Sequence, residues 1–296
     1  MLSAKARNRG APLVRIRLAA TTKAATVNES DRIVNARCAT LPLFIAMLTS
    51  PASSYAAAAA CAAASGSTVP AVVELYTSEG CDSCPPADRW LSSLSKQKLG
   101  DRAVALALHV DYWDRLGWKD RFASAGFSQR QREESARSGG EFVYTPQILL
   151  QGRDFPQWQR GAAFEQAIAA VNARPARAVL DLVVHPREGG VVDVDLSARV
   201  TDARERTDAV IALALVQNGL VSDVKAGENA GKRLQHDHVV RQWRQAVALD
   251  SSGAGSGKLS LALPPDPGPL SVVLLAENAR TGDVLQVLEL PLCAGR

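Results

Sequence analysis

Cys81 and Cys84, separated by two residues, are the pair in this sequence whose type and spacing best suit chemistry. A cysteine reacts as its thiolate, and two sulfurs at this spacing can close a disulfide and reopen it. An apolar run that ends at Gly80 precedes the pair, and a helical pattern begins at Ala87. The N–H groups at the start of a helix favour a nearby negative charge. The spacing therefore predicts a redox-active dithiol, with both sulfurs exposed, where a strand passes into a helix.

The same Cys-x-x-Cys pattern also occurs as half of a zinc site, which requires two further ligands at suitable spacing. The remaining cysteines and histidines form neither a second Cys-x-x-Cys nor a His-x₃₋₅-His pattern: Cys38, Cys61, Cys293, His109, His185, His236 and His238. His236 and His238 are most simply explained as exposed histidines of one strand. No Walker loop, dinucleotide-binding fingerprint or Ser-His-Asp order occurs. We therefore favour redox chemistry over zinc, and predict no bound metal and no cofactor.

The dithiol is expected to lie within an alternation of strands and helices. A nearly continuous apolar run over 102–110 predicts a buried parallel strand beside the strand at 71–76. Pro146 stands at the head of a further strand, where proline is tolerated, and its peptide bond is a candidate for the cis form. Together these elements predict an α/β domain over residues 69–176. Its helices are expected at 87–98, 128–138 and 164–171.

A polar and aromatic loop follows the strand at 102–110, and open α/β sheets usually carry their sites at that end of their strands. We expect this loop and the residue before Pro146 to border the dithiol and to select the partner. The candidate substrate-binding residues are Thr145, His109, Asp111, Tyr112, Trp113 and Trp118. Packing of the aromatic rings over the end of the sheet is an equally good account of each ring taken singly.

The dithiol at a strand–helix junction, with Thr145-Pro146 before a later strand, resembles the thioredoxin fold. The resemblance implies that Cys81 is the attacking cysteine, that Cys84 resolves the mixed disulfide, and that Pro146 packs beside the sulfurs as part of the catalytic site. More closely, the chain is similar to a secreted thioredoxin-like bacterial family of unknown function (domain of unknown function 1223). The similar stretches are 73–88, 109–114, 117–120, 144–147 and 227–231.

The two residues between the cysteines, Asp82 and Ser83, differ from the Gly-Pro of thioredoxins and from the His-containing motifs of strong oxidants. A carboxylate beside Cys81 opposes its thiolate electrostatically. We therefore predict that Cys81 is less acidic, and its disulfide less oxidising, than in a His-containing motif.

The pattern changes after Pro175, from alternating strands and helices to strands separated by turn signals. In 191–200, apolar and polar residues alternate with the period of two that marks a half-buried strand. Repeated short strands predict an antiparallel β-sandwich-like domain over 177–296. Its glycine-rich loop at 227–231 is more simply a long hairpin loop than a cradle for an anion. The strands are expected at 178–184, 191–200, 209–216, 239–249, 258–263, 270–276 and 284–290.

The basic net charge of the chain comes from its first part. Residues 1–60 carry eight basic and two acidic residues, so the remainder has a small acidic excess and no nucleic-acid partner is indicated. Arg37, the largely apolar run at 38–48 and the small residues at 54–58 are typical of a secretory signal. We therefore expect a removable leader over 1–60, a periplasmic or secreted protein, and no stable membrane span once the leader is removed.

Export would place the dithiol in an oxidising compartment, where disulfides persist. There, Cys61 and Cys293 are expected to pair and to tie the two ends of the mature chain together. The favoured function is that of an exported thioredoxin-like thiol–disulfide oxidoreductase, whose partner is a protein or peptide thiol or disulfide. The alternatives are a periplasmic binding or assembly module in which the Cys81–Cys84 bond is purely structural, and delivery of a soft metal such as copper.

Overall fold

The structure, a computed structural model, describes residues 60–96, 100–266 and 268–293. The expected leader, with its cleavage site, lies outside the described residues except for its last position. The described residues all belong to one compact unit. Within them, no helix combines the length and the apolar character that crossing a membrane requires.

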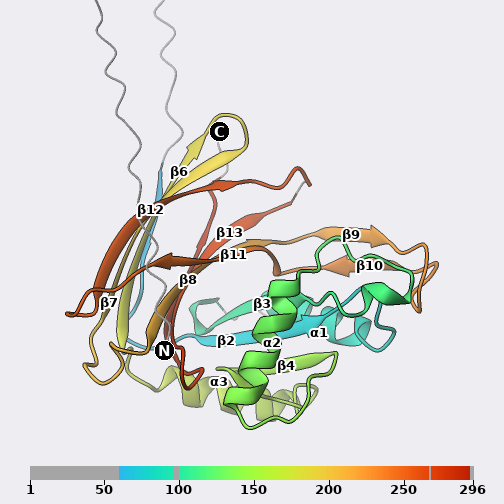
Figure 1. The fold of residues 1–296 in the computed structure, drawn as a ribbon, viewed down its shortest axis with the longest axis horizontal. Helices are drawn as coiled ribbons and strands as arrows, with labels where there is room; N and C mark the ends of the chain where they lie inside the picture. Colours follow the sequence, from blue (N-terminus) through green and yellow to red (C-terminus); the bar gives the residue numbers. More distant parts are fainter. Residues whose placement is uncertain (1–59, 97–99, 267, 294–296) are drawn as a thin grey trace, which may run out of the picture. The chain divides into compact units, whose positions relative to one another are not determined.

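An eight-stranded mixed sheet is the largest element of the fold (Figure 1). Its strands follow the order β14-β13-β8-β11-β3-β2-β4-β5. β3 pairs in parallel with β2 and β11, and the other neighbours are antiparallel. Every residue of β2 is buried, as expected for an apolar strand inside a sheet. The bounds are β2 (Ala71–Thr77), β3 (Ala103–His109), β4 (Gln147–Leu150), β5 (Arg153–Asp154), β8 (Ala209–Gln217), β11 (Val239–Val247), β13 (Leu270–Asn278) and β14 (Val284–Pro291).

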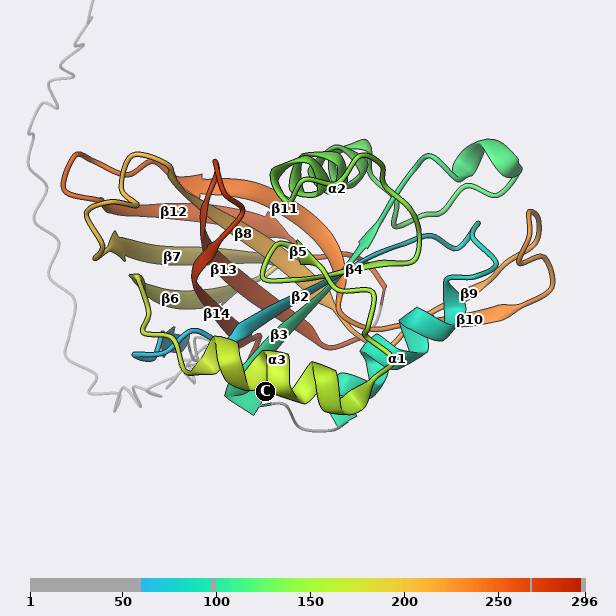
Figure 2. The ribbon, with the colours of Figure 1, turned by 90° about the horizontal axis from the view of Figure 1, so that it is seen from below.

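Helices cover both faces of the β2–β4 end of this sheet. Figure 2 shows α1 (Pro85–Lys96) and α3 (Gly161–Asn172) against one face, and α2 (Ala125–Arg137) against the other. The buried side chains of α1 and α3 recur every three or four residues, the spacing of one helical face: Leu91 and Leu94, then Phe164, Ile168 and Val171. Two short 3-10 turns, η1 (Gly100–Arg102) and η2 (Asp114–Leu116), lie before and after β3.

A second, antiparallel sheet of four strands packs on the other end of the large sheet. Its order is β1-β6-β7-β12, with bounds β1 (Cys61–Ala64), β6 (Ala178–Arg187), β7 (Val191–Val200) and β12 (Ala254–Ala262). Buried and exposed residues alternate along β6 and β7, as the sequence predicts. The buried residues form a core with the apolar face of β8, β13 and β14.

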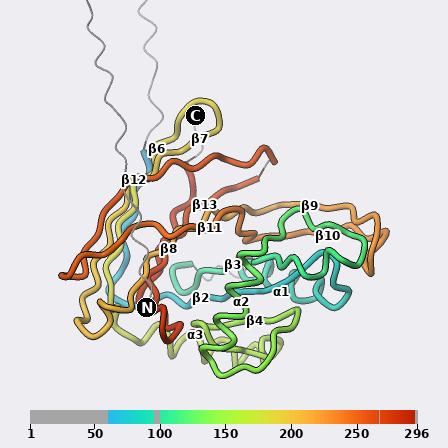
Figure 3. Tube along the Cα trace, viewed as in Figure 1, coloured from blue at the N-terminus to red at the C-terminus, as the bar shows by residue number. Residues whose placement is uncertain are grey.

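β9 (Leu220–Asp223) and β10 (Arg233–His236) form a separate two-stranded hairpin. The hairpin connects β8 to β11 and extends to the N-terminal end of α1 (Figures 2 and 3). The strand pattern of the sequence did not predict these two short strands.

The predicted fold class is wrong, although most predicted strands and helices are present. We expected an α/β thioredoxin-like domain followed by a separate antiparallel sandwich. The protein is instead mostly β, because β8, β11, β13 and β14 continue the sheet that contains β2 and β3. Val239 of β11 lies opposite Ala107 of β3, and the Ala107 N–H donates to the carbonyl of His238 at 2.7 Å. The segment limits 69–176 and 177–296 stay a prediction.

The expected pairing of the terminal cysteines is confirmed. A disulfide joins Cys61 to Cys293, with Cα atoms 6.1 Å apart and a sequence separation of 232. Cys61 begins β1 of the four-stranded sheet, and Cys293 follows β14 of the eight-stranded sheet. The bond therefore holds together the two sheets as well as the two ends of the described chain.

Candidate functional site

The dithiol is oxidised and lies directly before α1. Cys81 and Cys84 form a disulfide with Cα atoms 5.5 Å apart. The Asp88 N–H donates to the Cys84 carbonyl at 3.1 Å, so Cys84 is the residue that immediately precedes the helix and Pro85 is its first residue. Proline fits there because the first N–H groups of a helix have no partner within it. The Ser83 hydroxyl lies 3.3 Å from the Cys81 sulfur.

Both cysteines are fully buried, with 0% of their surface exposed. The expectation that the sulfurs are exposed at the start of the helix is therefore wrong. The expectation rested on the position of the pair at the start of a helix; Asp82 and Ser83, between the cysteines, are exposed. A segment far away in the sequence forms hydrogen bonds with the backbone of this turn.

That segment is the loop at the end of the β9–β10 hairpin. Asn229, itself fully buried, donates from its amide nitrogen to the carbonyls of Glu79 at 2.9 Å and Cys81 at 2.8 Å. The Glu228 carboxylate accepts from the Asp82 N–H at 3.2 Å. The loop is a hairpin loop, as expected, but its function in the fold is to close over the dithiol turn.

Trp113 connects the dithiol turn to the proline loop. Its indole N–H donates to the Thr145 hydroxyl at 2.8 Å, and the Thr145–Pro146 peptide bond is cis, as the sequence suggested. A Cβ added to Gly80 would lie 3.2 Å from the Trp113 Cβ, so the residue before Cys81 must be small. Thr145, Pro146 and Trp113 are half-buried.

The other predicted substrate-binding residues make hydrogen bonds within the fold or are buried. The Tyr112 hydroxyl donates to Gln131 of α2 at 3.2 Å, and the Asp111 carboxylate accepts from Ser128 of α2 at 2.5 Å. Burial raises the pKa of the Tyr112 phenol, although the bond to Gln131 opposes this. The Trp118 indole N–H donates to the Glu79 carboxylate at 2.7 Å. His109 is fully buried, so in this conformation a partner cannot touch it.

Beneath the dithiol turn lies a group of buried carboxyl and imidazole side chains, which we call the histidine cluster. It consists of Glu79, Asp88, His109, Asp120 and His236. His109 Nδ1 and an Asp120 oxygen are 2.7 Å apart, and the same oxygen accepts from the Glu79 N–H at 2.9 Å. His236 Nε2 lies 3.5 Å from the Glu79 carboxylate, and the rings of His109 and His236 are 5.0 Å apart at their centroids.

Burial and mutual charge shift the ionisation of this cluster. Burial lowers the pKa of His109, but the charge and hydrogen bond of Asp120 outweigh it, so the pKa is raised. Burial opposes the ionisation of Asp120, yet the charge of His109 keeps its pKa lowered. Asp88 has no such close partner, and burial raises its pKa despite the charges of His236 and His109. The cluster therefore holds an ion pair of His109 with Asp120 beside one acid, Asp88, whose protonated form is favoured by burial.

Several buried polar atoms of this cluster have no hydrogen-bond partner. They are His109 Nε2, both ring nitrogens of His236 and one oxygen of Glu79. Of these, His236 Nε2 and the Glu79 oxygen face each other at 3.5 Å, so among the described residues His109 Nε2 and His236 Nδ1 are the two atoms of this group with neither a hydrogen bond nor an ion pair. Buried polar atoms are normally satisfied, so a group of unsatisfied ones next to a disulfide requires an explanation. In the part of the chain that the structure describes, no group of three or more His, Cys, Asp or Glu side chains has the arrangement of a metal site.

The sequence interpretation missed most of the histidine cluster. Glu79, Asp88 and Asp120 lie within the stretches that carried the family resemblance, but nothing in their spacing marked them as neighbours. His236 was expected to be exposed and is 2% exposed, and His238 is also buried. The acidic residues around Cys81 were the available signal, because several carboxylates beside a dithiol disfavour its thiolates.

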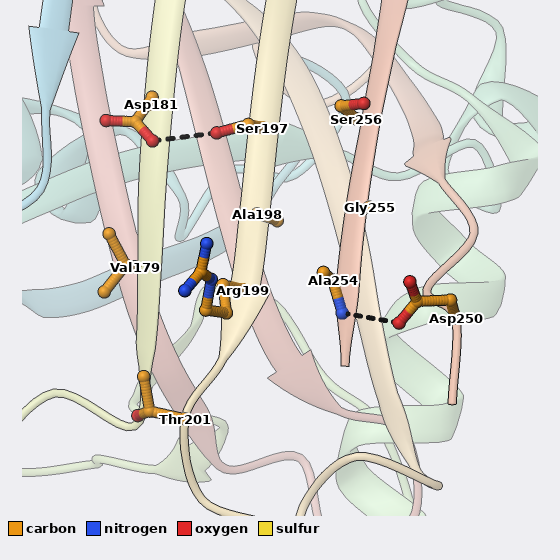
Figure 4. Close-up of a pocket in the computed structure, with 10 residues that line it drawn as sticks. All are labelled: Val179, Asp181, Ser197, Ala198, Arg199, Thr201, Asp250, Ala254, Gly255 and Ser256. Atoms are coloured by element: carbon orange, nitrogen blue, oxygen red, sulfur yellow. Dashed lines mark hydrogen bonds between the residues drawn. The ribbon is translucent and has the colours of Figure 1, made fainter. Parts of the chain in front are cut away.

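A hollow of about 600 Å³ lies on the outer face of the four-stranded sheet (Figure 4). Its walls are side chains of β6, β7 and β12 and of the turn before β12. They include Asp181, which accepts from Ser197, and Asp250 of that turn, which accepts from the Ala254 N–H. None of the residues that line it belongs to the dithiol turn, the hairpin loop or the histidine cluster. We therefore place the candidate site at the disulfide and not in this hollow.

The chain belongs to the DUF1223 family, described as a protein of unknown function, whose model matches residues 72–275. No curated protein matches the chain. The chain is similar to the X-ray crystal structure of a structural genomics target from Agrobacterium tumefaciens, with 27% identity and a TM-score of 0.52 over 76% of this chain and 95% of that one. It is also similar in fold to HBP35 of Porphyromonas gingivalis, with 13% identity and a TM-score of 0.57 over 77% and 76% of the two chains.

Proposed function

We propose that this protein is an exported thiol–disulfide oxidoreductase that exchanges its Cys81–Cys84 bond with thiols or disulfides of protein or peptide partners. The observation that carries the proposal is the position of this bond, directly before a helix and above a buried cluster of acids and imidazoles with unsatisfied atoms. A disulfide that only stabilised the turn would not need proton-binding groups beneath it.

The chemistry is written here in the direction that oxidises the partner. A partner thiolate attacks the Cys81 sulfur, the Cys81–Cys84 bond breaks, and Cys84 leaves as a thiolate that takes up a proton. A second partner thiolate then attacks the partner sulfur of the mixed disulfide and releases Cys81, which also takes up a proton. The partner loses two electrons and two protons, and the dithiol gains them. The reverse sequence reduces a partner disulfide.

Asp88 is well placed to supply or accept the proton of Cys84. It lies four residues after Cys84 on α1, hence on the same face of the helix. Burial raises its pKa, so it holds a proton at a higher pH than an exposed aspartate does. It also lines a small hollow between α1 and β10, together with Arg89 and Arg233, which gives a path for protons to solvent.

The acidic surroundings favour the disulfide over the thiolates. Asp82 and Glu228 lie at the turn, and Glu79 and Asp88 lie beneath it. Negative charges raise the pKa of nearby thiols and so destabilise the reduced, ionised form. The prediction that the disulfide is less oxidising than that of a His-containing motif therefore stands as part of this proposal.

The burial of both sulfurs favours the alternative, a periplasmic binding or assembly module in which the Cys81–Cys84 bond is purely structural. Insulin reduction by wild type, by Cys81→Ser and by the double variant Cys61→Ser/Cys293→Ser separates the two functions. An oxidoreductase loses activity in Cys81→Ser and keeps it in the double variant. Equal rates in wild type and Cys81→Ser would establish the structural function.

Cys84→Ala provides the matching search for a partner. Without the resolving cysteine, a mixed disulfide between Cys81 and its partner accumulates and can be isolated from periplasmic extract under non-reducing conditions. The partner should be released by dithiothreitol. Cys81→Ser/Cys84→Ala is the matched control and should capture nothing.

A further inference from the structure

The proposed exchange requires a sulfur that a partner can reach, yet both cysteines have 0% of their surface exposed. Attack on a disulfide proceeds in line with the sulfur–sulfur bond and needs open access to one sulfur. Some element must therefore move before the reaction begins. The contacts around the dithiol turn identify which element this is.

The loop at 224–232, between β9 and β10, is held on the dithiol turn by few bonds. Asn229 makes the two buried ones, to the carbonyls of Glu79 and Cys81. Glu228 makes one more, from the Asp82 N–H, and this bond is exposed to solvent. Because these hydrogen bonds are few, the loop can separate from the dithiol turn without unfolding the rest of the protein.

The strands that carry this loop are anchored by buried side chains, among them Leu220, Leu234 and His236, whereas most residues of the loop itself are exposed. β9 and β10 pair over four residues each and join neither of the larger sheets. Opening of the loop alone therefore exposes less buried surface than opening of the strands, and local opening is favoured over global unfolding. Gly227 and Gly231, with φ of 73° and 80°, flank the loop tip in a conformation that glycine adopts without strain.

We infer that the loop at 224–232 is a lid that must lift from the Cys81–Cys84 bond before any thiol reaches it, and that Asn229 is its latch. This inference rests on the proposed function and adds to it a closed resting state. Lifting the lid removes Asn229 from two carbonyls and breaks its contact with the aromatic loop, where Gly227 lies against Trp118. The core of the two large sheets stays in place.

The rate at which dithiothreitol reduces the Cys81–Cys84 bond tests whether Asn229 is the latch. One dithiothreitol gives two electrons and two protons to the bond and becomes a cyclic disulfide. Asn229→Ala should raise the rate at equal dithiothreitol about tenfold to a hundredfold, because two buried hydrogen bonds no longer hold the lid. Asp223→Ala, which removes an exposed pair with Arg233 within the hairpin, should stay within about twofold of wild type. Equal rates in wild type and Asn229→Ala would overturn the inference.

Wild type alone provides a second measurement, which does not depend on how the variant folds. If the lid opens locally, reduction in low urea should show a much weaker urea dependence than global unfolding, since little surface is exposed. At high dithiothreitol the rate should level off at the opening rate of the lid. A urea dependence equal to that of global unfolding would overturn the lid.

The lid and the proposed function fail in different ways. Fast reduction of Asn229→Ala together with equal insulin activity in wild type and Cys81→Ser keeps the lid and removes the oxidoreductase. Insulin activity that depends on Cys81, together with equal dithiothreitol rates in wild type and Asn229→Ala, keeps the oxidoreductase and removes the lid.

Discussion

Two groups of buried charged side chains lie against the large sheet. One includes Glu74 of β2, and the other includes Glu79, five residues later in the chain. The first, which we call the arginine cluster, consists of Glu74, Arg130, Glu134, Arg137 and Glu277. The second is the histidine cluster beneath the dithiol turn. Both are surrounded by apolar core, but only the first is built from opposite charges in close contact.

In the arginine cluster almost every charge is matched. Arg130 donates to Glu74 at 2.8 Å and to Glu277 at 2.8 and 2.9 Å, and its guanidinium stacks over the Trp243 ring at 4.3 Å. These contacts join α2 to β2 and β13. One oxygen of Glu134 is the exception without a hydrogen-bond partner.

The histidine cluster, by contrast, contains three acids, no arginine or lysine, and several unsatisfied nitrogen and oxygen atoms. A cluster that only stabilised the fold would be expected to satisfy its buried atoms, as the arginine cluster largely does. The difference indicates that the arginine cluster maintains the structure, and it is why we assign proton transfer to the histidine cluster.

The largest expected loss of stability comes from a substitution in the arginine cluster. Arg130→Met leaves three buried carboxylates without their main counter-charge, so we expect the free energy of unfolding to fall by about 3–5 kcal/mol. Urea unfolding with both disulfides oxidised measures this. Arg102→Met is the control, because its pair with Glu165 is half-exposed and should be worth less than about 1 kcal/mol. A loss no larger than that of the control would remove the structural function of the cluster.

The second prediction, for Glu134→Gln, is an increase in the free energy of unfolding. Burial, and then the charge of Glu74, raise the pKa of Glu134 to about 7 in the folded protein. Protonation therefore favours the folded state, and this contribution is full below the unfolded pKa and lost as pH rises through 7. Glu134→Gln should stabilise the protein by on the order of 1–3 kcal/mol at pH 8, with no gain at pH 4.

Glu133→Gln is the matched control for this prediction. Glu133 is the neighbouring residue on α2, is about half-exposed and pairs with the same Arg137 at 3.5 Å. Its substitution should leave the stability at pH 8 nearly unchanged. Equal pH profiles of unfolding for wild type and Glu134→Gln would show that folding does not raise the pKa of Glu134.

The smallest effect on stability, and the one that separates the clusters, is expected from Asp88→Asn. Burial already disfavours the Asp88 charge, so a neutral side chain of the same shape should change the free energy of unfolding by less than about 1 kcal/mol. Resolution of a mixed disulfide by Cys84 should slow by about tenfold or more at pH 7, because the proton-accepting group is lost.

Stopped-flow release of a small chromophoric thiol from the mixed disulfide at Cys81 measures this rate. Glu134→Gln, which alters the other cluster, should release the thiol at the wild-type rate. If Asp88→Asn and Glu134→Gln both match wild type, the contrast between a structural and a chemical cluster is wrong.

Local pattern was sufficient to predict most individual elements of this protein. The strand before the dithiol, the start of α1 near Pro85 and the cis peptide at Pro146 follow from apolar runs, turn residues and proline chemistry. The strands after residue 177 were also located closely by their alternation. These properties depend on neighbours within a few positions, so periodicity reveals them.

The arrangement of these elements was decided only by the tertiary structure. An apolar strand edge does not specify its partner, so nothing in β11 predicted its pairing with β3 through Val239 and Ala107. That pairing brings His236 to His109 and the hairpin loop to Cys81, across more than 120 positions in sequence. The sequence by itself determined that a dithiol precedes a helix. Its burial, its lid and its proton-binding neighbours depend on long-range contacts, which local pattern does not encode.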